Sequence, residues 1–233
     1  MTSLRYAIYY APQPQSALWC LASAWLGRDA ATGQDLEPPD FPGMRAADVR
    51  AITRDPARYG FHATLKPPFR LKEGVSEQDL LTAVERFAAV QAPVPMPRLI
   101  VSPIGKFLAL TPANETAELH AFAADCVATF DPYRAPPDEA ELARRRHTRL
   151  TPREDELLLR WGYPYVMDAF RFHMTLTGPL GSVERARICQ VLADRFDPLT
   201  AEPFPIDSVT LFEQRTPETP FRILKRFPFP GCG

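Results

Sequence analysis

The pattern of apolar and polar positions at the start of the chain predicts a strand, a helix and a second strand. The segment RYAIYY (5–10) is typical of a strand, and an apolar stripe over residues 16–27 predicts a helix that ends at a glycine. A proline-rich connector follows and runs to Pro42. The next strand, FHATLK, is expected to stop at Pro67 and Pro68, because proline cannot donate a hydrogen bond to a central ladder.

The same order of elements returns along the rest of the chain. Ser76 and Asp79 predict the start of a helix, because a serine cap and an acidic first turn satisfy free amides there. Two strands are expected around a turn at Gly105. A helix over 118–130 opens the second half, and strand, helix, strand, strand are expected in FRFHMTLT, VERARICQVLADRF, IDSVTLF and FRILKRF. The order βαββ therefore occurs twice.

Residues 131–165 form an insert without a counterpart in the first half. Within it, TPRE (151–154) is a capping box with proline at the first helical position, and it predicts a helix that ends at Gly162. No long flexible linker interrupts the chain.

We therefore predict an α+β fold in which the whole chain, 1–233, is a single bilobal domain. The first lobe is expected at 1–112, and the second at 113–233, including the helical insert 131–165. The two βαββ units are expected to be related by a pseudo-twofold axis, with antiparallel sheets that face a central cleft.

Composition and charge are those of an ordinary globular protein. Hydrophobic residues make up 45% and charged residues 24% of the chain, which excludes fibrous and collagen-like classes. The 27 basic and 28 acidic side chains give a net charge of −1, so there is no global field to capture nucleic acid or a membrane. Anion binding must then come from a local pocket.

Location and redox state follow from what the sequence does not contain. The N-terminus has no apolar core of a secretory signal, and the longest apolar stretch is too short to span a bilayer. We expect a cytoplasmic protein, a monomer, without a membrane partner. The cysteines are too far apart for a close metal or redox motif, so free thiols are expected at Cys20, Cys126, Cys189 and Cys232.

A short sequence is repeated in the two halves. YGFHATLKPPF (59–69) aligns without gaps with FRFHMTLTGPL (170–180), matching an aromatic residue, Phe, His, Thr, Leu and Pro. Because side chains alternate along a strand, His62, Thr64 and Lys66 are predicted to share one face. The same alternation groups four residues of the second copy, namely Arg171, His173, Thr175 and Thr177.

Two such polar faces meeting in one groove would suit phosphodiester chemistry. One imidazole can remove a proton from the attacking oxygen while the other protonates the leaving oxygen. Thr64 and Thr175 can hydrogen-bond the non-bridging oxygens, and Lys66 or Arg171 can offset the developing charge. Thr177 is a further candidate for substrate binding. No metal or other cofactor is needed for this reaction.

The paired His-x-Thr strands resemble the 2H phosphoesterase superfamily, which includes RNA 2',3'-cyclic phosphodiesterases and 2'-5' RNA ligase-like proteins. RYAIYYAP, YGFHATLKPPF, ELARRR, WGYPYV and FHMTLTG are similar to the branch of that superfamily named for phosphonate metabolism. The resemblance covers nearly the whole chain and implies a bilobal fold with a central cleft and metal-independent hydrolysis of a phosphodiester. It makes His62 with Thr64 the first catalytic motif, and His173 with Thr175 the second. It leaves open which histidine is the acid.

Several alternatives remain open from the sequence. Beside a small cyclic or linear phosphodiester, the substrate could be an RNA end, through 2',3'-cyclic phosphate hydrolysis or 2'-5' ligation. The chain could also be a phosphate or nucleotide sensor without turnover. His62 and His173 could be core histidines or zinc ligands. The run RRRHTR (144–149) could be a basic lid over the substrate, or a solvated helix face paired with Glu139 and Glu141. His120 and His147 are expected outside the site.

Overall fold

A computed structural model describes residues 4–147 and 149–231. The strands are β1 (Arg5–Tyr10), β2 (Ala63–Phe69), β3 (Val94–Met96), β4 (Leu99–Ile104), β5 (Phe107–Pro112), β6 (Met174–Thr175), β7 (Phe204–Ile206), β8 (Ser208–Gln214) and β9 (Arg222–Pro228). The α-helices are α1 (Ala17–Leu26), α2 (Ala46–Ala57), α3 (Glu77–Ala88), α4 (Ala117–Phe130), α5 (Glu139–Arg146), α6 (Pro152–Trp161) and α7 (Ser182–Thr200). Short 3-10 helices lie at η1 (Asp131–Tyr133) and η2 (Met167–Ala169).

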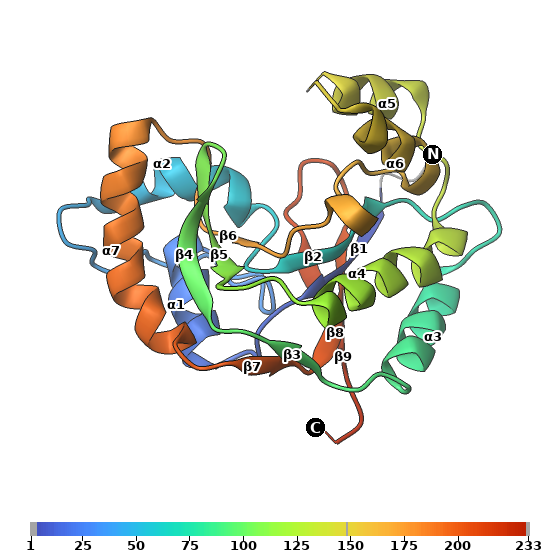
Figure 1. The fold of residues 1–233 in the computed structure, drawn as a ribbon, viewed down its shortest axis with the longest axis horizontal. Helices are drawn as coiled ribbons and strands as arrows, with labels where there is room; N and C mark the ends of the chain where they lie inside the picture. Colours follow the sequence, from blue (N-terminus) through green and yellow to red (C-terminus); the bar gives the residue numbers. More distant parts are fainter. Residues whose placement is uncertain (1–3, 148, 232–233) are drawn as a thin grey trace.

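One antiparallel sheet of seven strands runs through the described part of the molecule in the order β4-β5-β6-β2-β1-β8-β9 (Figure 1). Strands β3 and β7 form a separate two-stranded sheet. Helices α3 and α4 pack on the β2-β1-β8-β9 part of the large sheet, whereas α7 packs on β4 and β5. The predicted α+β class with antiparallel sheets is therefore confirmed.

The sheet order is symmetric about the β2–β6 contact. Reading outward from β2 gives β1 and then β8, and reading outward from β6 gives β5 and then β4. The chain order matches, because α3, β3 and β4 follow β2 just as α7, β7 and β8 follow β6. Strand β8 of the second half pairs with β1 of the first, and β5 of the first half pairs with β6 of the second, so the two halves interleave in one sheet. The lobe boundary at 112/113 stays a prediction.

Local capping signals place most helix ends where the sequence predicts them. The Ser16 hydroxyl accepts a hydrogen bond from the Trp19 amide at the start of α1, which ends at Gly27. Ser76 and Asp79 form a complete capping box on α3. A second capping box opens α6, which ends at Gly162 as predicted. These signals act within one turn of the chain, so they hold whatever the tertiary contacts.

Two strand lengths differ from the prediction. Strand β2 does not stop before Pro67 but continues through both prolines to Phe69. Its pairing with β6 is limited to Ala63 and Met174, so the prolines lie beyond that contact, where a missing N–H loses no bond to β6. In the second copy only Met174–Thr175 is a strand. The chain then turns away, and the Gly178 amide donates to the Ile52 carbonyl of α2 at 2.6 Å.

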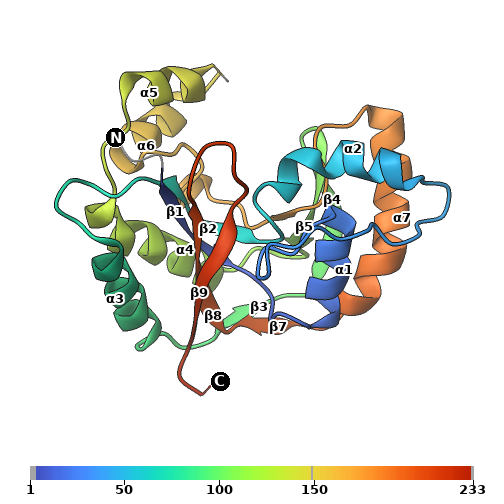
Figure 2. The ribbon, with the colours of Figure 1, turned by 180° about the vertical axis from the view of Figure 1, so that it is seen from behind.

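The core lies between the sheet and its helices and contains several large aromatic side chains. Trp19, Trp25 and Phe87 are buried. The Trp25 indole N–H also donates to the Leu176 carbonyl at 2.7 Å, which ties α1 to the chain just after β6. Helix α1 lies beside α2 and α7 (Figure 2). Cys20, Cys126 and Cys189 are free thiols, whereas Cys232 lies outside the described residues.

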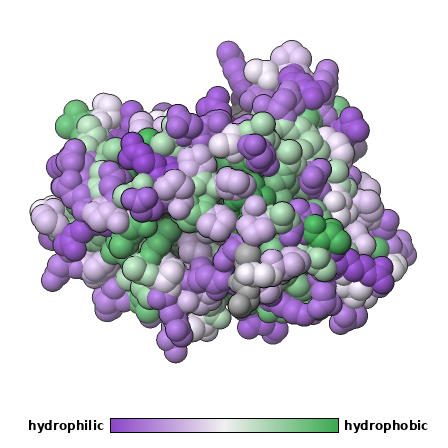
Figure 3. Space-filling view, turned by 60° about the horizontal axis from the view of Figure 1, so that its bottom comes forward, coloured by the Kyte–Doolittle hydropathy of each residue, from purple (hydrophilic) through white to green (hydrophobic). Residues whose placement is uncertain are grey.

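The outer surface carries few large apolar side chains. Hydrophilic residues cover most of the face in Figure 3, and the apolar ones form small separate patches. None of the helices in the described ranges combines the length and the apolar character of a membrane-spanning segment.

Candidate active site

The two copies of the repeated sequence meet at the centre of the sheet. Ala63 of β2 pairs with Met174 of β6, and these residues are equivalent in the two copies. His62 and Thr64 flank Ala63 in the chain, and His173 and Thr175 flank Met174, so this pair brings both motifs to one place. The Thr64 hydroxyl contacts the histidine of its own copy, 3.2 Å from Nε2 of His62.

These four side chains line one cleft with a volume of about 480 Å³. Its other walls come from β1, from Tyr59 before β2, from the two prolines within β2 and from the helical insert. The lining residues are Arg5, Tyr9, Tyr59, His62, Thr64, Pro67, Pro68, Arg144, Arg145, Tyr163, His173 and Thr175. The cleft has three arginines and two histidines but no carboxylate, so it suits an anionic ligand.

Both imidazoles are held in the same way. Nδ1 of His62 donates to the Gly60 carbonyl at 2.9 Å, and Nδ1 of His173 donates to the Arg171 carbonyl at 2.8 Å. A carbonyl can only accept, so each Nδ1 carries the hydrogen and each Nε2 is left to exchange a proton. Both acceptors lie two residues before the histidine, which is a further element of the repeat.

Gly60 allows the carbonyl to take this position. Its φ is +75°, and a Cβ there would lie 2.5 Å from the Ala30 Cβ, so no other residue fits without strain. The backbone of Gly60 thereby orients His62.

His62 is packed against the wall of the cleft. Its ring stacks on Tyr9 with the centroids 3.8 Å apart, and its Nε2 accepts a hydrogen bond from the Thr64 hydroxyl at 3.2 Å. Burial is the main cause that lowers the pKa of His62 to about 4; the hydrogen bond to Gly60 opposes this shift, and the nearby His173 adds to it. His62 is therefore neutral at pH 7, and its Nε2 lone pair faces the Thr64 hydroxyl, which must turn away before Nε2 can accept a proton.

His173 faces the same cleft from β6. Its ring centroid lies 6.0 Å from that of Phe107. Burial also lowers its pKa below the ordinary value.

The structure corrects the prediction for Lys66. Thr64 pairs with Tyr9 of β1, and Lys66 pairs with the neighbouring residue, Ile8. Strand β2 therefore has one extra residue at this point, a β-bulge, and Lys66 lies on the opposite face of the sheet from Thr64. Lys66 is only 1% exposed and points away from the cleft. Its Nζ donates to the Val127 carbonyl at 3.1 Å and to Asp131 at 3.2 Å. It joins β2 to α4 and the start of the insert, and it does not line the cleft.

Thr177 and Arg171 are also not among the residues that line the cleft. The buried Thr177 hydroxyl accepts from the Leu108 amide at 3.0 Å and donates to the Gly178 carbonyl at 2.9 Å. Its donor and its acceptor are thus both used in backbone contacts that hold the chain after β6. Arg171 is exposed, and it contributes its carbonyl to His173. The predicted substrate-binding roles of Lys66 and Thr177 are therefore wrong, because their polar atoms are buried in structural contacts.

The arginine run at 144–149 has features of both predicted arrangements, a basic lid over the cleft and a helix face paired with glutamate. Arg144 and Arg145 line the cleft, and both also pair with Glu141, at 3.9 and 3.1 Å. Arg145 lies over the Tyr163 ring, 4.7 Å from its centre. Arg146 instead pairs with Asp155 of α6 at 2.6 Å.

Sequence reasoning missed part of the cleft. Tyr59 stands at the aromatic position of the repeat, so the alignment carried a signal for it. Arg5 and Tyr9 reach the cleft through the pairing of β1 with β2, which no local pattern encodes. His120 bonds Glu115 at 2.8 Å, and neither it nor His147 lines the cleft.

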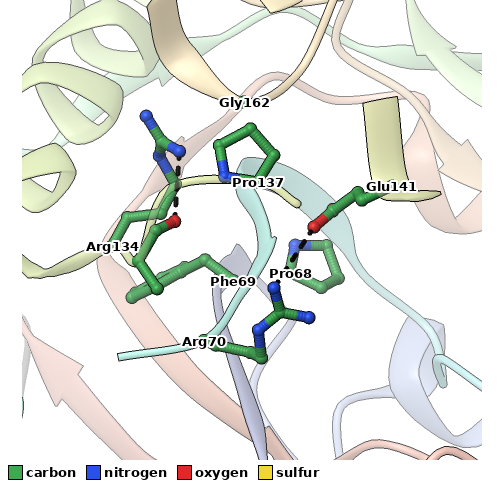
Figure 4. Close-up of a pocket in the computed structure, with 8 residues that line it drawn as sticks. Pro68, Phe69, Arg70, Arg134, Pro137, Glu141 and Gly162 are labelled. Carbon is green, nitrogen blue, oxygen red and sulfur yellow. Dashed lines mark hydrogen bonds and ion pairs between the residues drawn. The ribbon is translucent and has the colours of Figure 1, made fainter. Parts of the chain in front are cut away.

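A second, much smaller pocket lies beside the cleft, at the root of the insert. Its volume is about 20 Å³, enough for about one water molecule. Arg70 reaches toward Glu141 across it, and Arg134 lies on its opposite side (Figure 4). A Cβ at Gly162 would lie 2.9 Å from an Arg134 nitrogen, so the glycine at the end of α6 permits close contact with the Arg134 side chain.

The described ranges, 4–147 and 149–231, contain no cluster of three or more His, Cys, Asp or Glu side chains that could hold a metal ion. The chemistry available in the cleft is thus that of imidazole, hydroxyl and guanidinium groups.

Comparison with known proteins places the chain in a family. The profile of the family described as "Protein of unknown function (DUF1045)" matches residues 64–222, more than half of the chain. The chain belongs to the DUF1045 family. The match spans the threonine of the first motif and the whole second motif.

Curated relatives of this DUF1045 chain carry the name ribose 1,5-bisphosphate phosphokinase PhnN. The protein of Janthinobacterium sp. (strain Marseille) is 39% identical over 98% of the chain, and that of Laribacter hongkongensis (strain HLHK9) is 36% identical over 95%. The chain spans about half the length of these relatives, 51% in each case. Among solved structures, Usb1 of Kluyveromyces marxianus is similar with a TM-score of 0.40 and 12% identity, covering 98% of this chain and 99% of that one.

Proposed function

We propose that this chain is a phosphodiesterase of the 2H type, in which His62 and His173 act as base and acid on one small phosphodiester. The observation that carries the proposal is that both histidines line one anion-compatible cleft, where a carbonyl holds Nδ1 of each ring and leaves Nε2 as the atom that can exchange a proton. The 2H resemblance of the His-x-Thr motifs agrees with this chemistry. The proposed reaction uses no metal or other cofactor.

The roles follow from the two environments. Neutral His62 takes a proton from water at Nε2 as the water oxygen forms a bond to phosphorus. The bond from phosphorus to the leaving oxygen breaks, and protonated His173 supplies that oxygen with a proton from its Nε2. The products are a phosphomonoester and an alcohol, and proton exchange with solvent resets both imidazoles.

The threonines and an arginine stabilise the charge that develops on the phosphoryl oxygens. Thr64 and Thr175 line the cleft with both histidines, so their hydroxyls can donate to the two non-bridging oxygens, Thr64 by exchanging its contact with His62 Nε2 for the phosphoryl oxygen. Arg145 lines the cleft and offsets the charge in place of Lys66, whose position excludes that role.

The kinase name of the relatives does not transfer to the residues of this chain. The sequence has no G-x-x-x-x-G-K-[ST] loop to hold the phosphates of ATP. Since the chain matches only half of each relative, we assign the kinase name to the other half and phosphodiester hydrolysis to this one. A link to sugar phosphate or phosphonate metabolism, in the cytoplasm, is part of the same proposal.

The test is hydrolysis of a 2',3'-cyclic nucleotide by the purified chain. We expect His62→Ala and His173→Ala each to lower kcat/KM by about 10²- to 10⁴-fold. His120→Ala, which removes a histidine outside the cleft, is the matched control and should keep wild-type kinetics. Full activity in either cleft variant refutes the assignment.

The pH dependence tests the roles separately. A neutral His62 is present above its pKa of about 4, and a protonated His173 is present below a pKa that burial holds under 6.5. The profile of kcat/KM should therefore be bell-shaped with its maximum between about pH 4 and 6.5. A maximum above pH 8 contradicts this assignment of acid and base.

A further inference from the structure

Arg5 lines the cleft at a distance from the two imidazoles. Arg5 and Tyr9 lie on the same face of β1, and the Tyr9 ring stacks on His62. Four residues of strand separate the two Cα atoms by about 13 Å. Arg5 thus enters the cleft four residues along β1 from the Tyr9 ring that contacts His62.

The charge of Arg5 is held by a neutral partner. Its Nε donates to the side-chain oxygen of Gln214 at 2.8 Å, and its Nη2 bonds the same oxygen. The Gln214 amide nitrogen donates to the Thr219 carbonyl at 2.7 Å, which keeps the oxygen turned toward Arg5. Across the described ranges, no ion pair of Arg5 with a carboxylate is present within 4 Å.

An aromatic wall fixes the position of this guanidinium. Its Cζ lies 5.5 Å from the centre of the Phe221 ring, and that ring stacks on Tyr59 with the centroids 5.4 Å apart. Half-burial against these rings weakens hydration of the charge and lowers the pKa of Arg5 from its ordinary value. An anion arriving there would therefore meet a preorganised cation that is poorly solvated.

A second cation enters the same cleft from the insert. Arg144 of α5 lines the cleft with Arg5. Besides burial, which is the main cause, the Arg144 charge lowers the pKa of Arg5, whereas the Glu141 carboxylate behind Arg144 raises it. Arg144 makes only a long contact with Glu141, at 3.9 Å, and its side chain is 67% exposed. Two like charges beside one cavity without a lining carboxylate are stabilised when an anion lies between them.

We propose that the ligand carries a second anionic group, of the phosphomonoester class, which Arg5 and Arg144 bind while the phosphodiester lies between His62 and His173. The proposal rests on the proposed function for the reacting end of the ligand and extends it to the other end. Guanidinium groups bind a terminal phosphate through two parallel hydrogen bonds, which an ammonium group cannot match.

Binding measured by calorimetry tests this without requiring turnover. The probes are uridine 3'-monophosphate and uridine 3',5'-bisphosphate, which differ by one phosphomonoester. We expect the wild-type protein to bind the bisphosphate at least about 10-fold more tightly. In Arg5→Gln the ratio of the two affinities should fall to near one, and in Arg5→Lys it should be intermediate.

Two further variants keep the test decisive. Arg144→Gln alters an exposed side chain, so it should fold even where Arg5→Gln does not, and it should lower the affinity ratio. Arg187→Gln removes an exposed arginine that does not line the cleft, and it should keep the wild-type ratio. Equal affinity of the wild-type protein for both probes, or binding of neither, overturns the proposal.

Turnover then separates this inference from the proposed function. Uridine 2',3'-cyclic phosphate should be hydrolysed with a kcat/KM at least about 10-fold lower than its 5'-phosphorylated form. A bisphosphate preference in binding without hydrolysis of either compound refutes the phosphodiesterase and supports the second anion site. Hydrolysis of both compounds with equal kcat/KM, together with equal binding of the two probes, supports the phosphodiesterase and refutes the second anion site.

Discussion

The buried position of His62 should make the stability of the protein depend on pH in a way that one substitution removes. In the folded protein its pKa is about 4, whereas the ordinary value is 6.5. Between these values the unfolded chain binds a proton that the folded chain does not, so the free energy of unfolding falls on acidification. Above pH 6.5 both states hold a neutral imidazole, and this contribution is constant.

The magnitude follows from the displacement of the pKa. A full shift from 6.5 to about 4 corresponds to about 3 kcal/mol. Between pH 7 and pH 4.5, the contribution of His62 to the free energy of unfolding falls by about 2.5 kcal/mol. His62→Gln has no group that titrates here, so it should lose about 2.5 kcal/mol less stability than the wild-type protein over the same interval.

Urea unfolding followed by tryptophan fluorescence at pH 7 and pH 4.5 gives both free energies. Other groups titrate equally in the two proteins, so the difference between their pH dependences isolates His62. Any constant loss from the missing stack on Tyr9 cancels in this comparison. Parallel pH dependences in the two proteins, or an NMR titration of His62 with a midpoint near 6.5, would refute the reasoning.

Two other substitutions probe how the site is held. Gly60→Ala places a Cβ 2.5 Å from the Ala30 Cβ at a positive φ, so we expect a stability loss of about 1–3 kcal/mol in urea unfolding and a fall in kcat, because the carbonyl that orients His62 must move; unchanged kcat would contradict that role. Lys66→Met removes the buried bond to Asp131, which keeps Arg134 at 2.8 Å, so unfolding should become about 1–3 kcal/mol easier. KM should stay near the wild-type value, and a selective rise in KM would restore Lys66 to the substrate site.

Signals that act within a few residues were sufficient for much of the secondary structure. Ser76 with Asp79 and Thr151 with Glu154 form the predicted capping boxes, because each donor and acceptor lies in the same helical turn. Helix α2 was missed, since its sequence AADVRAITRDPA is polar overall and contains Pro56. Its inner face becomes apparent only from contact with α1.

The face of the sheet on which a side chain lies depends on tertiary contacts as well as on the alternation of residues along a strand. Lys66 follows the pattern of His62 and Thr64 in sequence, but one bulge opposite β1 turns it into the core. The bulge depends on the partner strand, which the local sequence does not specify.

The repeat indicated which residues come together, although not what surrounds them. His62, Thr64, His173 and Thr175 line one cleft, as the matched copies suggest, and their catalytic roles stay a prediction. Arg5 joins them because β1 lies between β2 and β8, a contact across more than 200 residues of chain. Only the folded sheet shows that this arginine belongs to the site.

The single pairing of Ala63 with Met174 has a consequence for how a ligand enters. Where acid and base sit on separate domains, hinge closure sets the gap between them. Here a backbone contact between neighbouring strands sets it, in the middle of a continuous sheet. Widening that gap would break the sheet, so we expect a ligand to enter past Arg144 of α5 and Tyr163 of the segment that follows α6. The distance between the two imidazoles would then limit the size of the group that fits between them.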